Sequence, residues 1–244
     1  GNSKIINSHI KTNSVVEDSI VKDSDVGPMG RVRPGSELTN THIGKTYATL
    51  KLIEDLSARG LKVGVMKPIE TGVVGTPEDA SILFETALKY NPELSSLKLK
   101  DIAPYQFELP AAPYVAKGRK RVSAELLESA YAKIEVLCDI VLIEGAGGLL
   151  VPIEDDLYMY DFIRLFGART LLIGHDRLGC INDVLLNLHL LDALGVDDYE
   201  WCINFREDKE TFDKTTKPFF QKLFGQVLSL QEDRQKIIDS LVRG

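Results

Sequence analysis

The sequence has few cysteines, no excess of positive charge and no long apolar run. Its three cysteines, Cys138, Cys180 and Cys202, lie far apart among apolar neighbours, so we expect reduced packing residues rather than a disulfide or a metal site. Reduced thiols indicate a reducing compartment, and the cytoplasm is the expected location. A net charge of -7 argues against a nucleic-acid partner. No apolar run reaches the roughly 18 residues that a membrane-spanning helix needs.

The first forty residues carry a repeat that the rest of the chain does not have. Apolar residues return every six positions with small and polar residues between them: Ile10 and Val16, then Ile20, Val26, Val32 and Leu38. Such hexapeptide periodicity predicts short strands stacked in coils. A few coils cannot protect their own edges, so we expect residues 1–38 to be poorly ordered or to pack against another surface.

This N-terminal stretch resembles a known family. Most of 16–44, "VEDSIVKDSDVGPMGRVRPGSELTNTHIG", is similar to part of the left-handed β-helix of the bifunctional enzyme that acetylates glucosamine 1-phosphate and uridylates N-acetylglucosamine 1-phosphate. Arg33 falls on the arginine of that family's Arg-Pro-Gly motif. The similarity ends there, without the nucleotidyltransferase domain or the acetyl-transfer coils, and it therefore implies no sugar-nucleotide activity.

From Gly44 onward, apolar segments of strand length alternate with amphipathic segments of helix length. We expect strands in 61–68, 139–145, 170–175 and 200–204, and helices in 45–59, 123–138, 178–194 and 211–224. The strand segments are too continuously apolar for half-exposed strands. This alternation predicts an α/β fold with a mostly parallel sheet and helices on both faces. Ligands then bind at the carboxyl ends of the strands.

A candidate phosphate loop precedes the first of these helices. The segment 39–46, "TNTHIGKT", ends in Gly-Lys-Thr at the expected helix start. Backbone N–H groups at such a helix start bind phosphate, Lys45 would contact its outer oxygens, and the Thr46 hydroxyl would bind magnesium. The tripeptide alone is a weak signal, because the usual first glycine of the loop is absent.

Polar clusters also follow two of the expected strands. "KPIETG", 67–72, places Lys67 and Thr71 at the working edge of the sheet. Asp79 begins the next helix, and "EGAGG", 144–148, places Glu144 at a strand end ahead of three glycines that allow close approach of the backbone to a ligand. Both carboxylates are suitable magnesium ligands, although Asp79 also suits a helix cap and Lys67 a simple strand end.

These motifs together resemble dethiobiotin synthase over residues 39 to about 230. The chain has "TNTHIGKT", "KPIETG", "EDA", "AAPYVA", "EGAGGLLVPI" and "LGCIND" in the order of that family's motifs. The resemblance implies a P-loop NTPase-like domain over 39–244, preceded by the hexapeptide-repeat-like segment 1–38. It also implies ATP and Mg²⁺ as cofactors.

The resemblance assigns individual residues to roles. Magnesium ligands would be Thr46, Asp79 and Glu144, and Lys67 and Lys45 would act in catalysis. The ATP site would comprise His42, Ile43, Gly44, Lys45, Thr46, Tyr47, Asp79, Glu144, Gly145, Ala146 and Gly147, with Asn204 and Phe205 at the adenine. Substrate contacts would be Thr71 together with Leu178, Gly179, Cys180, Ile181 and Asn182, the last five contributed by the partner subunit of a homodimer.

The implied reaction is an ATP-dependent ring closure. The carbamate formed from 7,8-diaminopelargonic acid and carbon dioxide attacks the γ-phosphate, and the second amine then closes a cyclic urea. Carbamate and triphosphate are both anionic, so lysines and magnesium are needed to bring them together. The expected role of Lys67 is electrostatic.

The start of the motif departs from the family. Where the family has a buried central strand, this chain has "RVRPGSEL", 31–38, whose charges and proline suit such a strand poorly. "TNTHIG" suits both families, as in a fusion or an assembly artefact. Two alternatives therefore stay open, a catalytically impaired fusion protein and a partitioning-type P-loop ATPase. The second is the weaker, because 37–43 contains no lysine where those ATPases have one.

Overall fold

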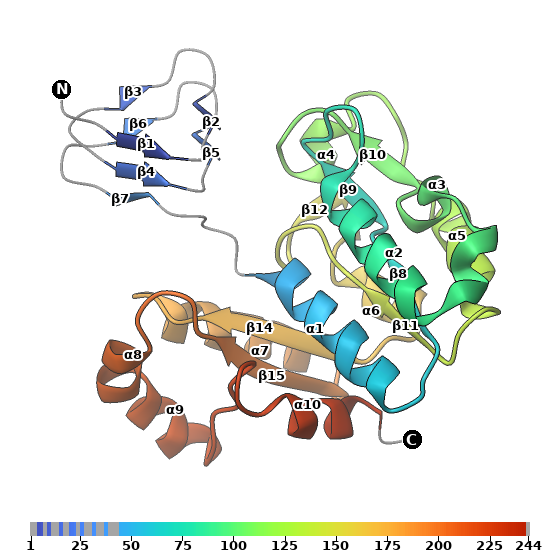
Figure 1. Cartoon of the computed structure of the whole chain (residues 1–244). Helices are drawn as coiled ribbons and strands as arrows, with labels where there is room; N and C mark the ends of the chain where they lie inside the picture. The colour runs from blue at the N-terminus through green and yellow to red at the C-terminus, as the bar shows by residue number, and fades with distance from the viewer. Residues whose placement is uncertain are drawn as a thin grey trace. The chain divides into compact units, whose positions relative to one another are not determined.

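The computed structural model describes residues 44–242 throughout and, within the first 43 residues, seven short strands. These strands are β1 (Lys4–Ile6), β2 (His9–Ile10), β3 (Val15–Val16), β4 (Ile20–Lys22), β5 (Asp25–Val26), β6 (Arg31–Val32) and β7 (Glu37–Leu38). Contacts divide the chain into two units, Gly1–Ile43 and Gly44–Gly244, which are drawn in Figure 1 and described separately below.

In the first unit, strands that are three places apart in the chain pair in parallel. The pairs form three groups, β1-β4-β7, β2-β5 and β3-β6, and the registers join Lys4 to Ile20 and Ile20 to Glu37. Three successive strands therefore make one coil with three sides. The six apolar residues of the repeat all lie in these strands, and β6 and β7, from the segment "RVRPGSEL", pair with β3 and β4.

The second unit alternates helices and strands. In chain order its elements are α1 (Lys45–Ala58), β8 (Val63–Met66), β9 (Ile69–Thr71), α2 (Glu78–Tyr90), the 3-10 helix η1 (Pro92–Ser96), α3 (Leu99–Ile102), β10 (Tyr105–Phe107), α4 (Pro113–Ala116), α5 (Ala124–Glu135), β11 (Ile140–Ile143), β12 (Pro152–Glu154), β13 (Leu157–Tyr158), α6 (Asp161–Leu165), β14 (Thr170–His175), α7 (Cys180–Ala193), β15 (Tyr199–Asn204), α8 (Lys209–Thr215), α9 (Lys217–Phe224) and α10 (Arg234–Leu241). The four strands expected from the sequence in this unit are β8, β11, β14 and β15.

These four strands form two parallel pairs. β8 pairs with β11 from Val63↔Ile140 to Met66↔Ile143, and β14 pairs with β15 from Thr170↔Tyr199 to His175↔Asn204. A third parallel pair joins β9 to β10, and β12 and β13 form a short antiparallel pair. The predicted parallel α/β architecture is confirmed.

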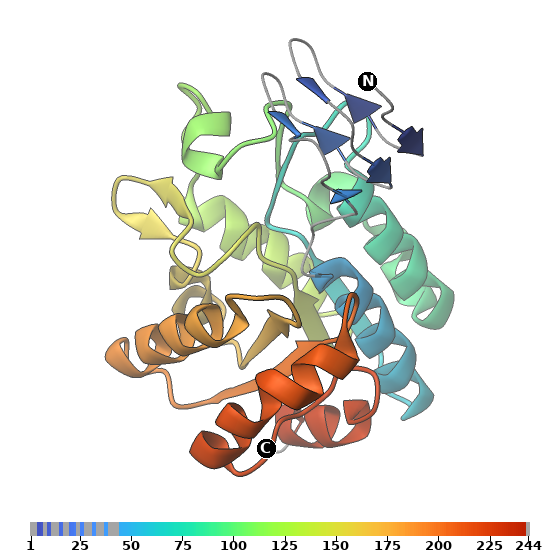
Figure 2. The same cartoon turned by 90° about the vertical axis from the view of Figure 1, so that its left-hand side faces the viewer.

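Helices cover both strand pairs. α1, α2 and α5 pack against β8, α7 packs against β14, and α10 packs against β15. Figure 1 shows α2 in front of β8 and α7 behind β14. Figure 2 shows the orange and red C-terminal helices gathered on one side of the unit, with the cyan and green helices on the other. In the described part of the chain, no helix has the length and apolarity that crossing a membrane requires.

Helix α1 joins the hydrophobic cores of the two strand pairs. Its buried face carries Ala48, Leu52, Ile53 and Leu56, at the spacing of a helical stripe. The last three belong to the large core around β8, whereas Ala48 packs in a small core with Cys202 of β15. The start of α1 therefore lies between the carboxyl ends of both pairs.

Two expectations about individual elements are wrong. The helix expected over 211–224 is two helices, α8 and α9, separated at Thr216. Pro218 lies in the first turn of α9, where it has no N–H to continue the hydrogen bonds of α8. Full burial of all four strands is also not observed, because β8 is buried at every position while β11 is only partly buried throughout.

Candidate active site

Lys67 and Glu144 lie together because they follow two adjacent parallel strands. Lys67 comes directly after β8 and Glu144 directly after β11, and the Glu144 N–H donates a 2.9 Å hydrogen bond to the Met66 carbonyl. Carboxyl ends of neighbouring parallel strands meet at one edge of a sheet. The sequence predicted both residues at this edge, and the structure brings them into contact.

The Lys67 ammonium joins two carboxylates. Its Nζ lies 2.5 Å from Glu144 Oε1 and 2.9 Å from Asp79 Oδ2. The side chains of Lys67 and Glu144 are 5% and 2% exposed, whereas Asp79 is 43% exposed. The cluster therefore combines a buried ion pair, Lys67 and Glu144, with one half-exposed carboxylate, Asp79.

These two carboxylates favour the protonated, charged form of Lys67. Burial is the largest single influence and by itself lowers its pKa, but the carboxylates of Glu144 and Asp79 together outweigh it, so the pKa is raised. At Lys45, burial and the charge of Lys67 lower the pKa, and the two carboxylates only partly offset this. Lys45 therefore loses its proton before Lys67 as the pH rises.

Two hydroxyls from the first turns of α1 reach the same cluster. Thr46 Oγ1 lies 2.9 Å from Glu144 Oε1 and 3.1 Å from Asp79 Oδ1. Thr49, one turn later, donates to Glu144 Oε2 at 3.1 Å. The Thr46 hydroxyl has one proton, so it can donate to only one of these two carboxylates at a time. Oxygen atoms from the start of α1, the start of α2 and the end of β11 thus lie close together.

Asp79 is held in this region by a third carboxylate. Glu70, in β9, is 6% exposed and accepts hydrogen bonds from the backbone N–H groups of Asp79, at 3.0 Å, and Ala80, at 2.9 Å. These N–H groups belong to the first turn of α2 and have no partner within the helix. Burial raises the pKa of Glu70, although the two hydrogen bonds oppose that shift.

The phosphate site predicted from the sequence would lie at the N-terminus of α1. Gly44 caps the helix with φ 82°, a left-handed conformation that favours glycine. A side chain here would also collide with its surroundings, because a Cβ on Gly44 would lie 2.4 Å from Asn204 Nδ2. Lys45, Thr46 and Tyr47 form the first turn that follows. His42 and Ile43 lie outside the described residues.

The glycine segment after Glu144 turns sharply at Gly147, where φ is 86°. A Cβ at this position would lie 2.8 Å from Val151 Cγ2, and one on Gly145 would lie 3.3 Å from Met159 Sδ. Both glycines therefore allow the segment 144–148, which includes Ala146, to pack tightly on the chain that follows. Thr71 ends β9, four residues after Lys67.

The second strand pair is followed by an amide and a carboxylate that bind nearby parts of the chain. Asn204, at the end of β15, is buried, and its Oδ1 accepts a 2.7 Å hydrogen bond from Gln231 Nε2. Phe205 follows it. The buried carboxylate of Asp176, after β14, accepts hydrogen bonds from the backbone N–H groups of 206, 207 and 208. The loop that follows Asn204 is thereby fixed.

The predicted substrate segment, Leu178 to Asn182, begins α7 at the carboxyl end of β14. Gly179 caps the helix with φ 98°, and Leu178 is fully exposed. Cys180 is buried, and burial raises the pKa of its thiol to about 12. This segment therefore belongs to the second strand pair, while Lys67 belongs to the first.

Comparisons with known proteins show the family to which the chain belongs. A family model described as an AAA domain matches residues 39–227. The ATP-dependent dethiobiotin synthetase BioD of a Sulfurovum species is 44% identical over 203 residues, which are 83% of this chain and 96% of that protein. The chain belongs to the dethiobiotin synthetase family. The dethiobiotin synthetase of Wolinella succinogenes is 32% identical over 207 residues, 84% of this chain and 95% of that protein.

The N-terminal resemblance is also confirmed. The bifunctional protein GlmU of Aliarcobacter butzleri is 88% identical over 51 residues, which are 21% of this chain and only 12% of that protein. The match to GlmU covers 21% of the chain, and the match to the Sulfurovum dethiobiotin synthetase covers 83%. These two shares add up to more than the whole chain, so the two matched segments overlap. An overlap agrees with the expectation that one short string suits both families.

Sequence analysis missed three residues of the site. Glu70 lies inside the motif "KPIETG", and its position between Lys67 and Thr71 was the available signal. Thr49 lies one helical turn after Lys45, where a hydroxyl shares a face with the helix start. Gln231 follows no motif, and only the fold brings it to Asn204.

Proposed function

We propose that this chain catalyses the ATP-dependent closure of a cyclic urea from 7,8-diaminopelargonic acid and carbon dioxide. The observation that carries the proposal is the convergence of Lys67, Asp79, Glu144 and Thr46 at the start of α1, in a chain of the dethiobiotin synthetase family. One lysine, two carboxylates and a hydroxyl at a helix N-terminus suit a reaction between two anions.

The proposed chemistry has two steps. The substrate carbamate attacks the γ-phosphorus of ATP, ADP leaves, and a carbamic-phosphoric anhydride forms. The second amine then attacks the carbamoyl carbon, and inorganic phosphate leaves as the urea ring closes. Lys45 and the N–H groups of the first turn of α1 would hold the phosphates, and the Lys67 ammonium would reduce the repulsion between carbamate and γ-phosphate.

The donor atoms present suit a magnesium ion. The Thr46 hydroxyl lies within 3.1 Å of Asp79 and 2.9 Å of Glu144, and Mg²⁺ prefers oxygen ligands that include one or two carboxylates. These three residues would hold the ion, which supplies positive charge at the phosphate oxygens when bound. Lys67 balances the same carboxylates in the structure described here.

The substrate end of the proposal extends beyond one chain. Thr71 and the segment 178–182 are the proposed substrate contacts, and a second copy of the chain would supply that segment in a cytoplasmic homodimer. The exposed N-terminus of α7, with Gly179 as its cap, suits the carboxylate of the substrate.

The direct test is ring closure by the full chain with diaminopelargonic acid, bicarbonate, ATP and magnesium. Lys67→Gln keeps the length of the side chain and removes its charge, so the rate should fall by about 100-fold or more. Lys62→Gln is the matched control, because Lys62 is exposed and pairs with Glu93. It should keep the wild-type rate.

The two kinetic constants separate the possible roles of Lys67. A fall in kcat with little change in the KM for ATP supports a charge that acts in the reaction. A change in the KM for ATP alone would make Lys67 a nucleotide-binding residue. Absence of ring closure by the wild-type chain, with ATP binding intact, would contradict the proposed function itself.

A further inference from the structure

His175, the last residue of β14, contacts the chain at two points further on. Its Nδ1 accepts a 3.1 Å hydrogen bond from the Arg177 N–H, and its Nε2 lies 2.9 Å from Asp183 Oδ2. A backbone N–H can only donate, so Nδ1 carries no proton and the proton of the neutral ring lies on Nε2. His175 therefore accepts from Arg177 and donates to Asp183.

These two partners lie on either side of the proposed substrate segment, 178–182. Arg177 is the residue before the segment, and Asp183 is the residue after it. His175 is itself held by the sheet, because it pairs with Asn204 in the register of β14 and β15 and its side chain is only 12% exposed. One side chain at the end of a strand thus binds both ends of the segment.

The start of the segment has few contacts of its own. Leu178 is fully exposed, and a Cβ on Gly179 would meet no atom within 4 Å. Cys180 is the first buried residue of the segment and packs in the core around β14 and β15. The position of the residues before Cys180 therefore depends on how the flanking chain is held.

Asp183 connects His175 to the far end of the segment. Its Oδ1 accepts a 3.2 Å hydrogen bond from Asn182 Nδ2, while its Oδ2 faces His175. The hydrogen bond from His175 is the largest influence on the pKa of Asp183 and lowers it. The carboxylate is therefore charged at neutral pH and can accept from both neighbours.

We propose that His175 is a positioning residue for the substrate, which fixes segment 178–182 by holding Arg177 and Asp183. This inference rests on the proposed function, in which that segment contacts the substrate. Each copy of the chain carries the same contacts, so the argument holds whichever copy supplies the segment. Loss of His175 should weaken substrate binding and leave the phosphate end of the site unchanged.

His175→Ala removes both hydrogen bonds. The Kd for diaminopelargonic acid, measured by isothermal titration on the full chain with magnesium, should rise by about tenfold, on the scale of one or two hydrogen bonds. The Kd for ATP and the kcat at saturating substrate should keep their wild-type values, because the contacts proposed for Lys45 and Lys67 belong to α1 and the first strand pair. His189→Ala is the matched control, since His189 is exposed in α7.

Two further variants separate the two hydrogen bonds. His175→Gln places an amide nitrogen where Nε2 lies and keeps a donor for Asp183, whereas His175→Asn places an acceptor where Nδ1 lies and keeps the contact with Arg177. Each should bind diaminopelargonic acid about threefold more weakly than the wild-type chain, and so more tightly than His175→Ala. If His175 only filled space, the larger Gln would restore binding and the smaller Asn would not.

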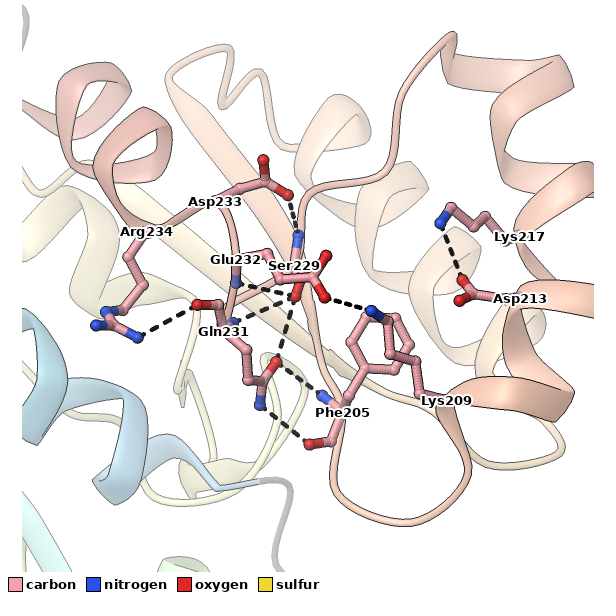
Figure 3. A network of polar contacts seen from close by, with 9 residues as sticks. All are labelled: Phe205, Lys209, Asp213, Lys217, Ser229, Gln231, Glu232, Asp233 and Arg234. Carbon is pink, nitrogen blue, oxygen red and sulfur yellow. Dashed lines mark hydrogen bonds and ion pairs between the residues drawn. The ribbon is translucent and has the colours of Figure 1, made fainter.

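Asp183→Ala tests the same contact from its other end. It should raise the Kd for diaminopelargonic acid by about threefold, and by little when His175→Ala is already present, because the shared hydrogen bond is then lost. Asp213→Ala is the matched control. It removes a carboxylate of α8 that accepts a 2.9 Å hydrogen bond from Lys217 (Figure 3), and it should leave the Kd unchanged.

The outcomes separate this inference from the proposed function. An unchanged Kd for diaminopelargonic acid in His175→Ala, or an equal weakening of substrate and ATP binding, would overturn the inference while leaving the ring-closure proposal intact. Full additivity of His175→Ala and Asp183→Ala would overturn their shared role. A wild-type chain that binds diaminopelargonic acid but closes no ring would contradict the proposed function alone, and a chain that does not bind it would contradict both.

Discussion

The two parallel strand pairs of the second unit differ in what they present at their carboxyl ends. The pair β8/β11 is followed by two side chains that form an ion pair, Lys67 and Glu144. The pair β14/β15 is followed by the Asp176 carboxylate, which accepts from the backbone of 206–208, and ends in the amide of Asn204. Charged groups stabilise transferring phosphate, whereas amides and backbone groups discriminate between neutral bases. In the proposed function, the first pair serves the reacting end of the nucleotide and the second pair its base, with α1 between them.

The two pairs also differ in the size of their cores. The core around β8 and β11 contains 22 buried residues, and those around β14 and β15 contain seven and five. In the described part of the chain, β11 and β14 each pair along one edge only, and both are partly exposed along most of their length. Leu171 of β14 packs against the large core, so the two open edges belong to neighbouring parts of one fold. One more parallel strand would complete the sheet.

Supplying that strand should have the largest effect. Replacing residues 1–38 with methionine and a short apolar strand that ends in Ser-Ala should pair with both open edges and bury their apolar side chains. We expect the free energy of unfolding to rise by about 3 kcal/mol, which for a chain of this size is roughly 6–12 °C in Tm. The rate of ring closure should rise with it. Thermal melts and the ring-closure assay measure both effects.

The matched control for this replacement carries a Gly-Ser segment of the same length in place of the apolar strand. It should gain neither stability nor activity, because it removes the hexapeptide segment without providing a buried strand. If the original chain is as stable and as active as the replaced one, residues 1–38 are a working part of the fold. That result would mean that the open edges of β11 and β14 lower neither the stability nor the activity of the chain.

The sequence predicted most of this architecture because the signals for its strands, helices and motifs lie in short stretches of adjacent residues. Gly-Lys-Thr, the lysine after β8 and the glutamate after β11 are each defined by a few adjacent residues, and alternation of apolar segments was enough to place the four strands. The unsuitable composition of "RVRPGSEL" indicated a poorly formed central strand, but not which strands would lie beside it. What the sequence did not reveal depends on contacts between distant segments. Gln231 reaches Asn204 across 27 positions and Thr49 reaches Glu144 across 95.

Glu70, in β9, provides a test of the charged cluster at the end of the first strand pair. Glu70→Gln replaces one acceptor oxygen with an NH₂ group that faces an N–H of α2, so Asp79 should lose its fixed position. We expect Mn²⁺, used as a probe for the metal site, to bind about tenfold more weakly by electron paramagnetic resonance, on the scale of residues that orient metal ligands.

Two further measurements show whether this effect stays in the first pair. The Kd for ATP measured without a metal ion should not change in Glu70→Gln, because Glu70 acts on the metal site through the start of α2. Glu78→Gln, at an exposed position beside Asp79, should leave Mn²⁺ binding near the wild-type value. Equal weakening in both variants would show that net charge, and not the hydrogen bonds from Glu70, governs the metal site.

The smallest expected effect concerns the local stability of the two pairs. β8 is buried at every position, and β15 is buried from Trp201 to Asn204, so side-chain burial alone predicts equal protection of their amides. The cores behind them are unequal, and we therefore expect the amides of β15 to open with a free energy about 1 kcal/mol lower than those of β8, within the range of local opening. Native-state hydrogen exchange, followed on peptides that cover 63–66 and 199–204, measures the difference. The completed sheet should reduce this difference in opening free energy, because a shared central strand would couple the two pairs. Equal exchange of the two strands in the original chain would mean that α1 alone already couples them.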